Sequence, residues 1–115
     1  MDKRKSADHF APLGPYLVTK DELPDPHQLS IWLEVNGELL QNSNTGDLIF
    51  NIPTLVSYVS NYMTLLPGDV ISTGTPSGVG MGLKEPRYLK AGDRVRLGIE
   101  GLGESAQVAI QDPEA

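Results

Sequence analysis

The first regular pattern in the chain is an alternation of apolar and polar residues over positions 29–35. The apolar side chains stand at every second position, namely Leu29, Ile31, Leu33 and Val35. This period of two predicts a strand with one buried face. Asn36-Gly37 follows the strand, and both residues accept the positive φ of a type I′ turn. We therefore expect an antiparallel hairpin over residues 29–43.

A second hairpin is predicted over residues 94–110. Apolar residues again alternate with polar ones on both sides of a Gly101-Leu102-Gly103 turn: Val95, Leu97 and Ile99 before it, and Ala106, Val108 and Ile110 after it. The turn at Ala91-Gly92-Asp93 leads into this hairpin. Pro67-Gly68-Asp69 has a similar composition, and it predicts a short strand over residues 69–73.

One substantial helix is predicted over about residues 52–66. Its apolar residues recur at helical spacing: Leu55, Val56, Val59, Tyr62, Met63 and Leu66. Asn51 is suited to cap the start, Pro53 to the first turn, and Pro67-Gly68 to end the helix. Because its Thr, Ser, Asn and β-branched residues are weak helix formers, we expect this helix to need a surface to pack on.

Length and composition favour one mainly β (α+β) domain. The chain has 115 residues, with twelve glycines and nine prolines that indicate many turns. A net charge of −6 without a Lys/Arg cluster argues against nucleic-acid binding. The absence of cysteine excludes disulfides and thiolate chemistry within these residues. No apolar run is long enough to span a membrane. We expect a soluble, cytoplasmic protein.

The glycine-rich segment 74–82 is the first candidate for chemistry. Gly78 and Gly80 begin a G-x-G-x-x-G pattern, but Leu83 stands where its third glycine belongs, and the Lys-Ser/Thr of a P-loop is missing. Two interpretations remain open. The segment is a plain turn, or its Thr73 and Thr75 hydroxyls and backbone N–H groups hold a carboxylate.

Other candidate groups are dispersed along the sequence. His9 and His27 are the only histidines, and without a G-x-S-x-G nucleophile motif they are expected to be surface or loop residues. The carboxylates form no Glu-x-Glu pair and no calcium loop. The sequence therefore predicts no complete metal site.

The order of the motifs resembles the fumarylacetoacetate hydrolase family. The opening Arg4-Lys5-Ser6-Ala7-Asp8-His9-Phe10 and Ala11-Pro12-Leu13-Gly14-Pro15 are similar to the family text G-K-S-x-D-T-F and A/G-P-x-G-P. Later blocks agree in order and spacing: Val35-Asn36-Gly37-Glu38, Gln41 to Asn44-Thr45, Leu48-Ile49-Phe50, Thr64 to Ile71, Thr73-Gly74-Thr75-Pro76-Ser77-Gly78-Val79-Gly80, Tyr88 to Asp93, and Ile99 to Gly103. The resemblance covers about residues 4–111, and it is strongest to the branch of ureidoglycolate lyases and diketo-deoxy-sugar-acid hydrolases.

The resemblance implies a β-rich roll or sandwich of mixed sheets and a homo-oligomer, usually a dimer. It implies a small-molecule 2-oxo acid of the acylpyruvate or diketo acid type as substrate. A Mg²⁺ or Mn²⁺ ion would stabilise the enolate formed when a C–C bond is cleaved. Lys5 matches the family's active-site lysine, and Thr75 matches its substrate-contacting threonine. Gly74 and Thr73 lie beside that threonine as further substrate-binding residues.

The sequence also departs from the family. The family's metal ligands, a Glu-x-Glu pair and an aspartate, precede the lysine motif, whereas only four residues precede Lys5 here. His9 and Ala7 stand where threonine and often phenylalanine are usual. Residues 1–115 are therefore expected to be the C-terminal part of one catalytic domain, without its metal-ligand half. Two hypotheses follow: part of a metal-dependent hydrolase or lyase that is inactive by itself, or a non-catalytic binding or structural module.

Overall fold

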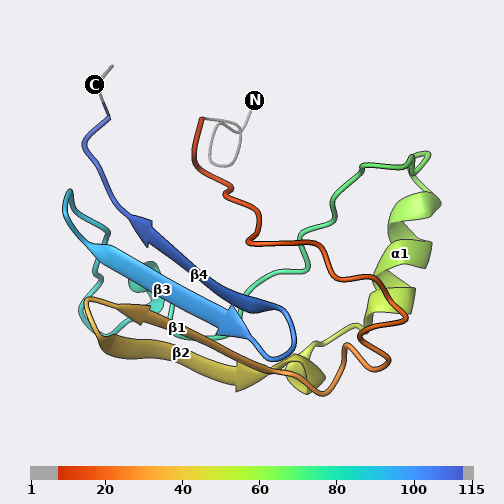
Figure 1. The fold of residues 1–115 in the computed structure, drawn as a ribbon, viewed down its shortest axis with the longest axis horizontal. Helices are drawn as coiled ribbons and strands as arrows, with labels where there is room; N and C mark the ends of the chain where they lie inside the picture. Colours follow the sequence, from red (N-terminus) through yellow and green to blue (C-terminus); the bar gives the residue numbers. More distant parts are fainter. Residues whose placement is uncertain (1–7, 113–115) are drawn as a thin grey trace.

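A four-stranded antiparallel sheet forms the centre of the computed structural model, which describes residues 8–112. Its strands are β1 (Ser30–Val35), β2 (Glu38–Asn44), β3 (Arg94–Ile99) and β4 (Gly103–Val108). Their order is β2-β1-β3-β4, so the two expected hairpins are confirmed and join edge to edge through β1 and β3 (Figure 1). Lys5 lies outside the described residues.

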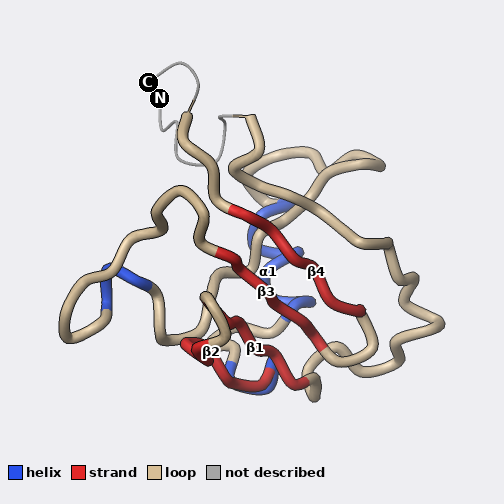
Figure 2. Tube along the Cα trace, turned by 60° about the vertical axis from the view of Figure 1, so that its left-hand side comes forward, coloured by secondary structure: helices blue, strands red, loops and turns tan. Residues whose placement is uncertain are grey.

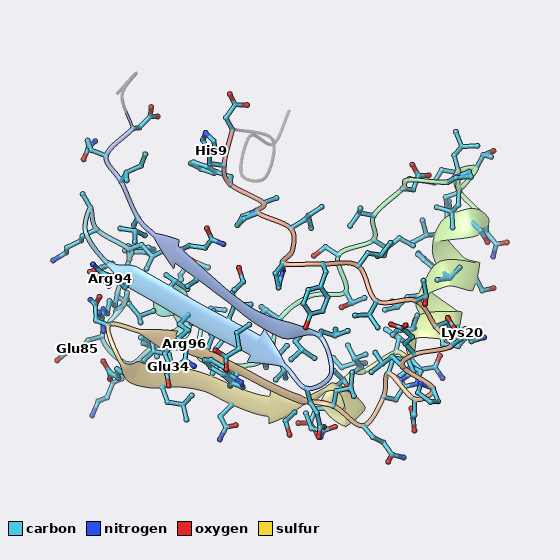
Figure 3. The ribbon with its side chains drawn as sticks, in the orientation of Figure 1. His9, Lys20, Glu34, Glu85, Arg94 and Arg96 are labelled. Carbon is cyan, nitrogen blue, oxygen red and sulfur yellow. The ribbon has the colours of Figure 1, made fainter. Side chains whose placement is uncertain are left out.

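The two faces of the central strands, β1 and β3, differ as the alternation predicts, whereas in β4 the apolar Ala106 and Val108 pair with Arg96 and Arg94 on the outer face. On the inner face Ile31 pairs with Ile99, and Val35 pairs with Val95. On the outer face the Arg96 guanidinium lies 5.1 Å from the Trp32 ring centroid. Arg96 also donates to Glu104 at 2.6 Å and lies 3.7 Å from Glu34, its neighbour in Figure 3. On β1 and β3 the charged groups thus lie on the outer face, and apolar side chains line the inner one.

The helix is shorter than the sequence predicts. Helix α1 spans Ile52–Ser60, and the Asn51 side chain caps it by accepting from the Thr54 N–H at 2.9 Å. The chain leaves the helix through tighter turns, in which Asn61 N–H bonds to the Tyr58 carbonyl and Tyr62 N–H to the Val59 carbonyl. In Figure 1 α1 stands apart from the strands, and in the turned view of Figure 2 it lies behind β3 and β4. The weak helix formers after Ser60 therefore receive no tertiary support from the sheet.

The buried core of the described residues is small. Leu29 and Val35 are the apolar side chains buried there, whereas Leu17 and Ile49 are each 91% exposed. The strand expected over 69–73 is not formed, and these residues run as an irregular segment. Two 3-10 helices, η1 (Thr45–Asp47) and η2 (Gly80–Gly82), complete the elements. No helix in the described part of the chain is long and apolar enough to cross a membrane.

Candidate functional site

Two cavities lie along the inner face of the sheet, beside the loop of residues 73–80. The larger cavity, of about 600 Å³, is lined by Leu29, Ile31 and Ile99 from the sheet side and by residues of the 43–55 segment. The smaller cavity, of about 230 Å³, is lined by Leu33, Val35 and Val95. Thr75 lines both cavities. The 73–80 loop is therefore placed where a ligand on this face would meet it.

The structure brings the three expected substrate-binding residues together at the larger cavity. Thr73, Gly74 and Thr75 all line it and are all exposed. Gly74 has a φ of +95°, which a residue with a side chain rarely adopts. Within residues 8–112, the N–H groups of these three residues have no backbone acceptor. The loop thus presents hydroxyl and amide donors to a ligand oxygen.

Close backbone contacts hold this loop against its neighbours. A Cβ atom added to Gly78 would overlap the Leu40 carbonyl on β2, and Gly78 has a φ of +101°. A Cβ atom on Gly80 would overlap the Arg87 carbonyl in the same way. The Arg87 N–H also bonds to the Gly80 carbonyl at 2.9 Å. The second and third glycines of the loop therefore serve close packing, and no phosphate-binding role is needed to explain them.

Gln41 is a residue of this site that the sequence analysis did not select. Its side chain is 8% exposed, and its Nε2 donates to Thr75 Oγ1 at 2.8 Å and to the Pro76 carbonyl at 3.0 Å. The one available signal was its place among the family-like blocks, which gave it no role. A regular hairpin would have turned Gln41 away from this face.

The charged residues at the cavities are few. Asp47 is the charged residue that lines the larger cavity, and it accepts a hydrogen bond from Ser43 Oγ at 2.6 Å. Arg87 lines the smaller cavity and is paired with Glu38 at 3.0 Å. Among residues 8–112, no three His, Asp or Glu side chains gather as a metal site. Among the described residues, the larger cavity therefore offers neutral hydrogen-bond donors and a single carboxylate. This is not the set of several oxygen ligands that a Mg²⁺ or Mn²⁺ ion needs.

Neither histidine lines either cavity. His9 is exposed, on the segment that precedes β1 (Figure 3). His27 is half-buried in a loop, and its Nε2 accepts a hydrogen bond from the Ile52 N–H at 3.0 Å. The expectation of surface or loop histidines is confirmed, with the addition that His27 caps the start of α1.

Comparisons with a family profile, with related sequences and with solved structures all indicate the same family. The sequence profile of the fumarylacetoacetate (FAA) hydrolase C-terminal domain matches residues 2–109. A presumptive hydrolase from Burkholderia multivorans is 60% identical over 108 residues. That alignment covers 93% of this chain and 38% of the relative.

Solved structures of two hydrolases are also similar. Fumarylacetoacetate hydrolase from Exiguobacterium antarcticum aligns with a TM-score of 0.86 and 44% identity, covering 91% of this chain and 38% of that one. Maleylpyruvate hydrolase from Sphingobium sp. SYK-6, in complex with manganese(II) and pyruvate, aligns with a TM-score of 0.81 and 44% identity, over 90% and 37% of the two chains. The chain thus spans a little over a third of the length of these relatives.

Proposed function

Because this chain belongs to the fumarylacetoacetate hydrolase family, we propose that its 73–80 loop binds the carboxylate of a 2-oxo acid in a hydrolase or lyase that cleaves a C–C bond. The observation that carries this proposal is the set of donors on the larger cavity. Thr73, Gly74 and Thr75 are exposed on this cavity, and their backbone N–H groups have no backbone acceptor within the described residues. Neutral donors of this kind bind a carboxylate oxygen with defined orientation.

The substrate class follows from chemistry and from a relative. Pyruvate, which the Sphingobium enzyme structure contains, is itself a 2-oxo acid. An acylpyruvate or diketo acid carries the same head group with an apolar or polar extension. The apolar walls of the larger cavity, such as Leu29 and Ile99, suit that extension.

A cation at this site would have to come from outside residues 8–112. We assign the positive charge to Lys5, which matches the family's active-site lysine, and a Mg²⁺ or Mn²⁺ ion to carboxylates beyond the described residues. The role of the described residues is then to orient the substrate carboxylate. A second candidate, a binding module without turnover, is favoured by the lack of a carboxylate cluster in the described part of the chain.

Titration of the ¹⁵N-labelled chain with pyruvate tests the proposed site. We expect amide shifts at Thr73, Gly74 and Thr75, and an affinity about tenfold weaker in Thr75→Val, because one hydrogen bond to a charged group is lost. Ser77→Ala, in the same loop, is the control and should bind as the unaltered chain does. Shifts that avoid the loop would contradict the proposal.

Lys5→Ala and a turnover assay separate the two candidate functions. Lys5→Ala should weaken pyruvate binding while Lys3→Ala does not, if Lys5 supplies the charge. Incubation with an acylpyruvate and Mg²⁺ or Mn²⁺, with the N-terminal part of the Burkholderia multivorans relative added, then distinguishes them, since a binding module gives no new carboxylic acid product even when that part is supplied. Equal binding by Lys5→Ala and the unaltered chain would end the assignment of Lys5.

A further inference from the structure

A β-bulge in β2 determines which face Gln41 occupies. Around the Asn36-Gly37 turn Val35 pairs with Glu38, and Glu34 pairs with Leu39. The register then shifts, so that Leu33 pairs with Gln41 rather than with Leu40. Without this shift Gln41 would stand opposite Trp32, on the outer face. The extra residue therefore turns Gln41 onto the inner face, beside the 73–80 loop.

The Pro76 carbonyl determines the orientation of the Gln41 amide. A carbonyl oxygen can only accept, so Nε2 of Gln41 must face it, as it does at 3.0 Å. The second hydrogen on Nε2 is then directed at Thr75 Oγ1, 2.8 Å away. The Thr75 hydroxyl accepts this hydrogen bond, and its own hydrogen remains to be donated. Its acceptor within the described chain, the Pro76 carbonyl, lies at a longer 3.4 Å.

We propose that Gln41 is a positioning residue that makes the Thr75 hydroxyl a hydrogen-bond donor toward a ligand oxygen in the larger cavity. The inference rests on the proposed function, in which that oxygen belongs to the carboxylate of a 2-oxo acid. Since Gln41 is buried and bonded to two neighbouring loop residues, it fixes both the place and the polarity of the hydroxyl. The site is therefore selective for a ligand atom that accepts a hydrogen bond.

The hydrogen-bond pattern is tested first, without any ligand. In the ¹⁵N spectrum of the free chain, both Gln41 side-chain amide hydrogens should exchange slowly with water. Thr75→Val should shift one of the two and accelerate its exchange, whereas Thr75→Ser should keep both as they are. If Thr75→Val leaves both hydrogens unchanged, the inference is overturned.

Pyruvate affinity in a double-mutant cycle then tests the positioning role. We expect Gln41→Met and Thr75→Val each to weaken pyruvate binding about tenfold, and the double variant to bind no more weakly than Thr75→Val alone. Gln41→Glu, which keeps the shape but accepts the Thr75 hydrogen, should also bind about tenfold more weakly at neutral pH. Thr75→Ser should retain the affinity.

The two possible failures are distinguishable. If Thr75→Val weakens binding but Gln41→Met and Gln41→Glu do not, the proposed function stands and the positioning role is wrong. A further loss on adding Gln41→Met to Thr75→Val would mean that Gln41 only supports the fold, which also overturns the inference. If neither Thr75 nor Gln41 variants change pyruvate binding, the proposed function itself fails, and the inference falls with it.

Discussion

The Asn36 side chain joins the β1–β2 turn to the turn that precedes β3. Its Nδ2 donates to Asp93 Oδ1 at 2.9 Å, and its Oδ1 accepts from the Arg94 N–H at 2.9 Å. The Asn36 N–H also bonds to the Arg94 carbonyl. Asn36 has a φ of 52°, which asparagine tolerates better than most residues. These bonds fasten the end of β1 to the start of β3 and so support the pairing of the two central strands.

Asp93→Asn should make the chain less stable at neutral pH. Hydrogen bonds from the Lys90 N–H and from Asn36 lower the pKa of Asp93 below its usual 3.8. A lowered pKa in the folded state means stabilisation that is present above pH 3.8 and is lost as the pH falls through the folded-state pKa. We therefore expect Asp93→Asn to lower the thermal midpoint at pH 7 and to lower it less near pH 2.

The control for this prediction is Asp8→Asn, an exposed carboxylate on the segment before β1. It should leave the midpoint unchanged at both pH values. An equal effect of Asp93→Asn at pH 7 and at pH 2 would show that the carboxylate charge contributes nothing.

The local parts of the fold could be predicted from the sequence. The alternation over 29–35 and the Asn36-Gly37 turn are both local signals, and the hairpin they predict is present. The two predicted turns at 66–69 and 90–93 are also present. In each of them an aspartate accepts from a backbone N–H: Asp69 from Leu66 at 2.7 Å, and Asp93 from Lys90 at 2.8 Å. In the described structure only the second leads into a strand, because a strand needs a partner that sequence pattern does not reveal.

The candidate site could likewise be predicted only where local sequence determines it. The Thr73-Gly74-Thr75 segment could be chosen from its residue types and its family-like order. Gln41 could not, because its place on the inner face depends on a bulge that shifts the pairing by one residue. The end of α1 at Ser60 could not be predicted either. Apolar residues continue at helical spacing to Leu66, but the helix stops earlier because these later residues lack the packing that would extend it.

Gly78→Ala should displace the 73–80 loop from β2. An alanine there adopts an unfavourable φ and also overlaps the Leu40 carbonyl, so backbone must move. Gly68→Ala is the matched control, since Gly68 has a φ of +93° but nothing within 4 Å of the added Cβ. We expect about 1 kcal/mol of destabilisation for Gly68→Ala and at least twice as much for Gly78→Ala in urea unfolding. Equal losses would mean that the loop does not pack closely on β2.

His27→Asn should weaken the start of α1. The shorter side chain can no longer accept from the Ile52 N–H, which is one of the helix's first unpaired donors. Loss of such a cap costs about 1 kcal/mol, measurable by urea unfolding and by loss of helical circular dichroism. His9→Asn is the control, since His9 is exposed and asparagine tolerates its φ of 65°. A stability equal to that of the control would remove the capping role.

The chain should associate with itself in solution, because α1 and the residues after it present a cluster of exposed apolar side chains. Tyr58, Tyr62, Met63 and Leu66 are between 61% and 73% exposed. The rings of Tyr58 and Tyr62 already pack on each other, with centroids 5.1 Å apart. Apolar area contributes about 25 cal/mol per Å² when it is buried. The net charge of −6 opposes association only weakly, since charges are screened beyond about 8 Å at 0.15 M salt.

Light scattering at micromolar concentration should therefore give a mass above 12.4 kDa. The double change Tyr62→Lys and Met63→Lys should lower that mass, because it removes two apolar side chains from the cluster. Asn61→Lys with Thr64→Lys adds the same charge to the same segment but leaves the cluster intact, so it should stay associated. A monodisperse 12.4 kDa particle that unfolds cooperatively would show that the described core suffices by itself, and that this apolar cluster has no partner in a second copy of the chain.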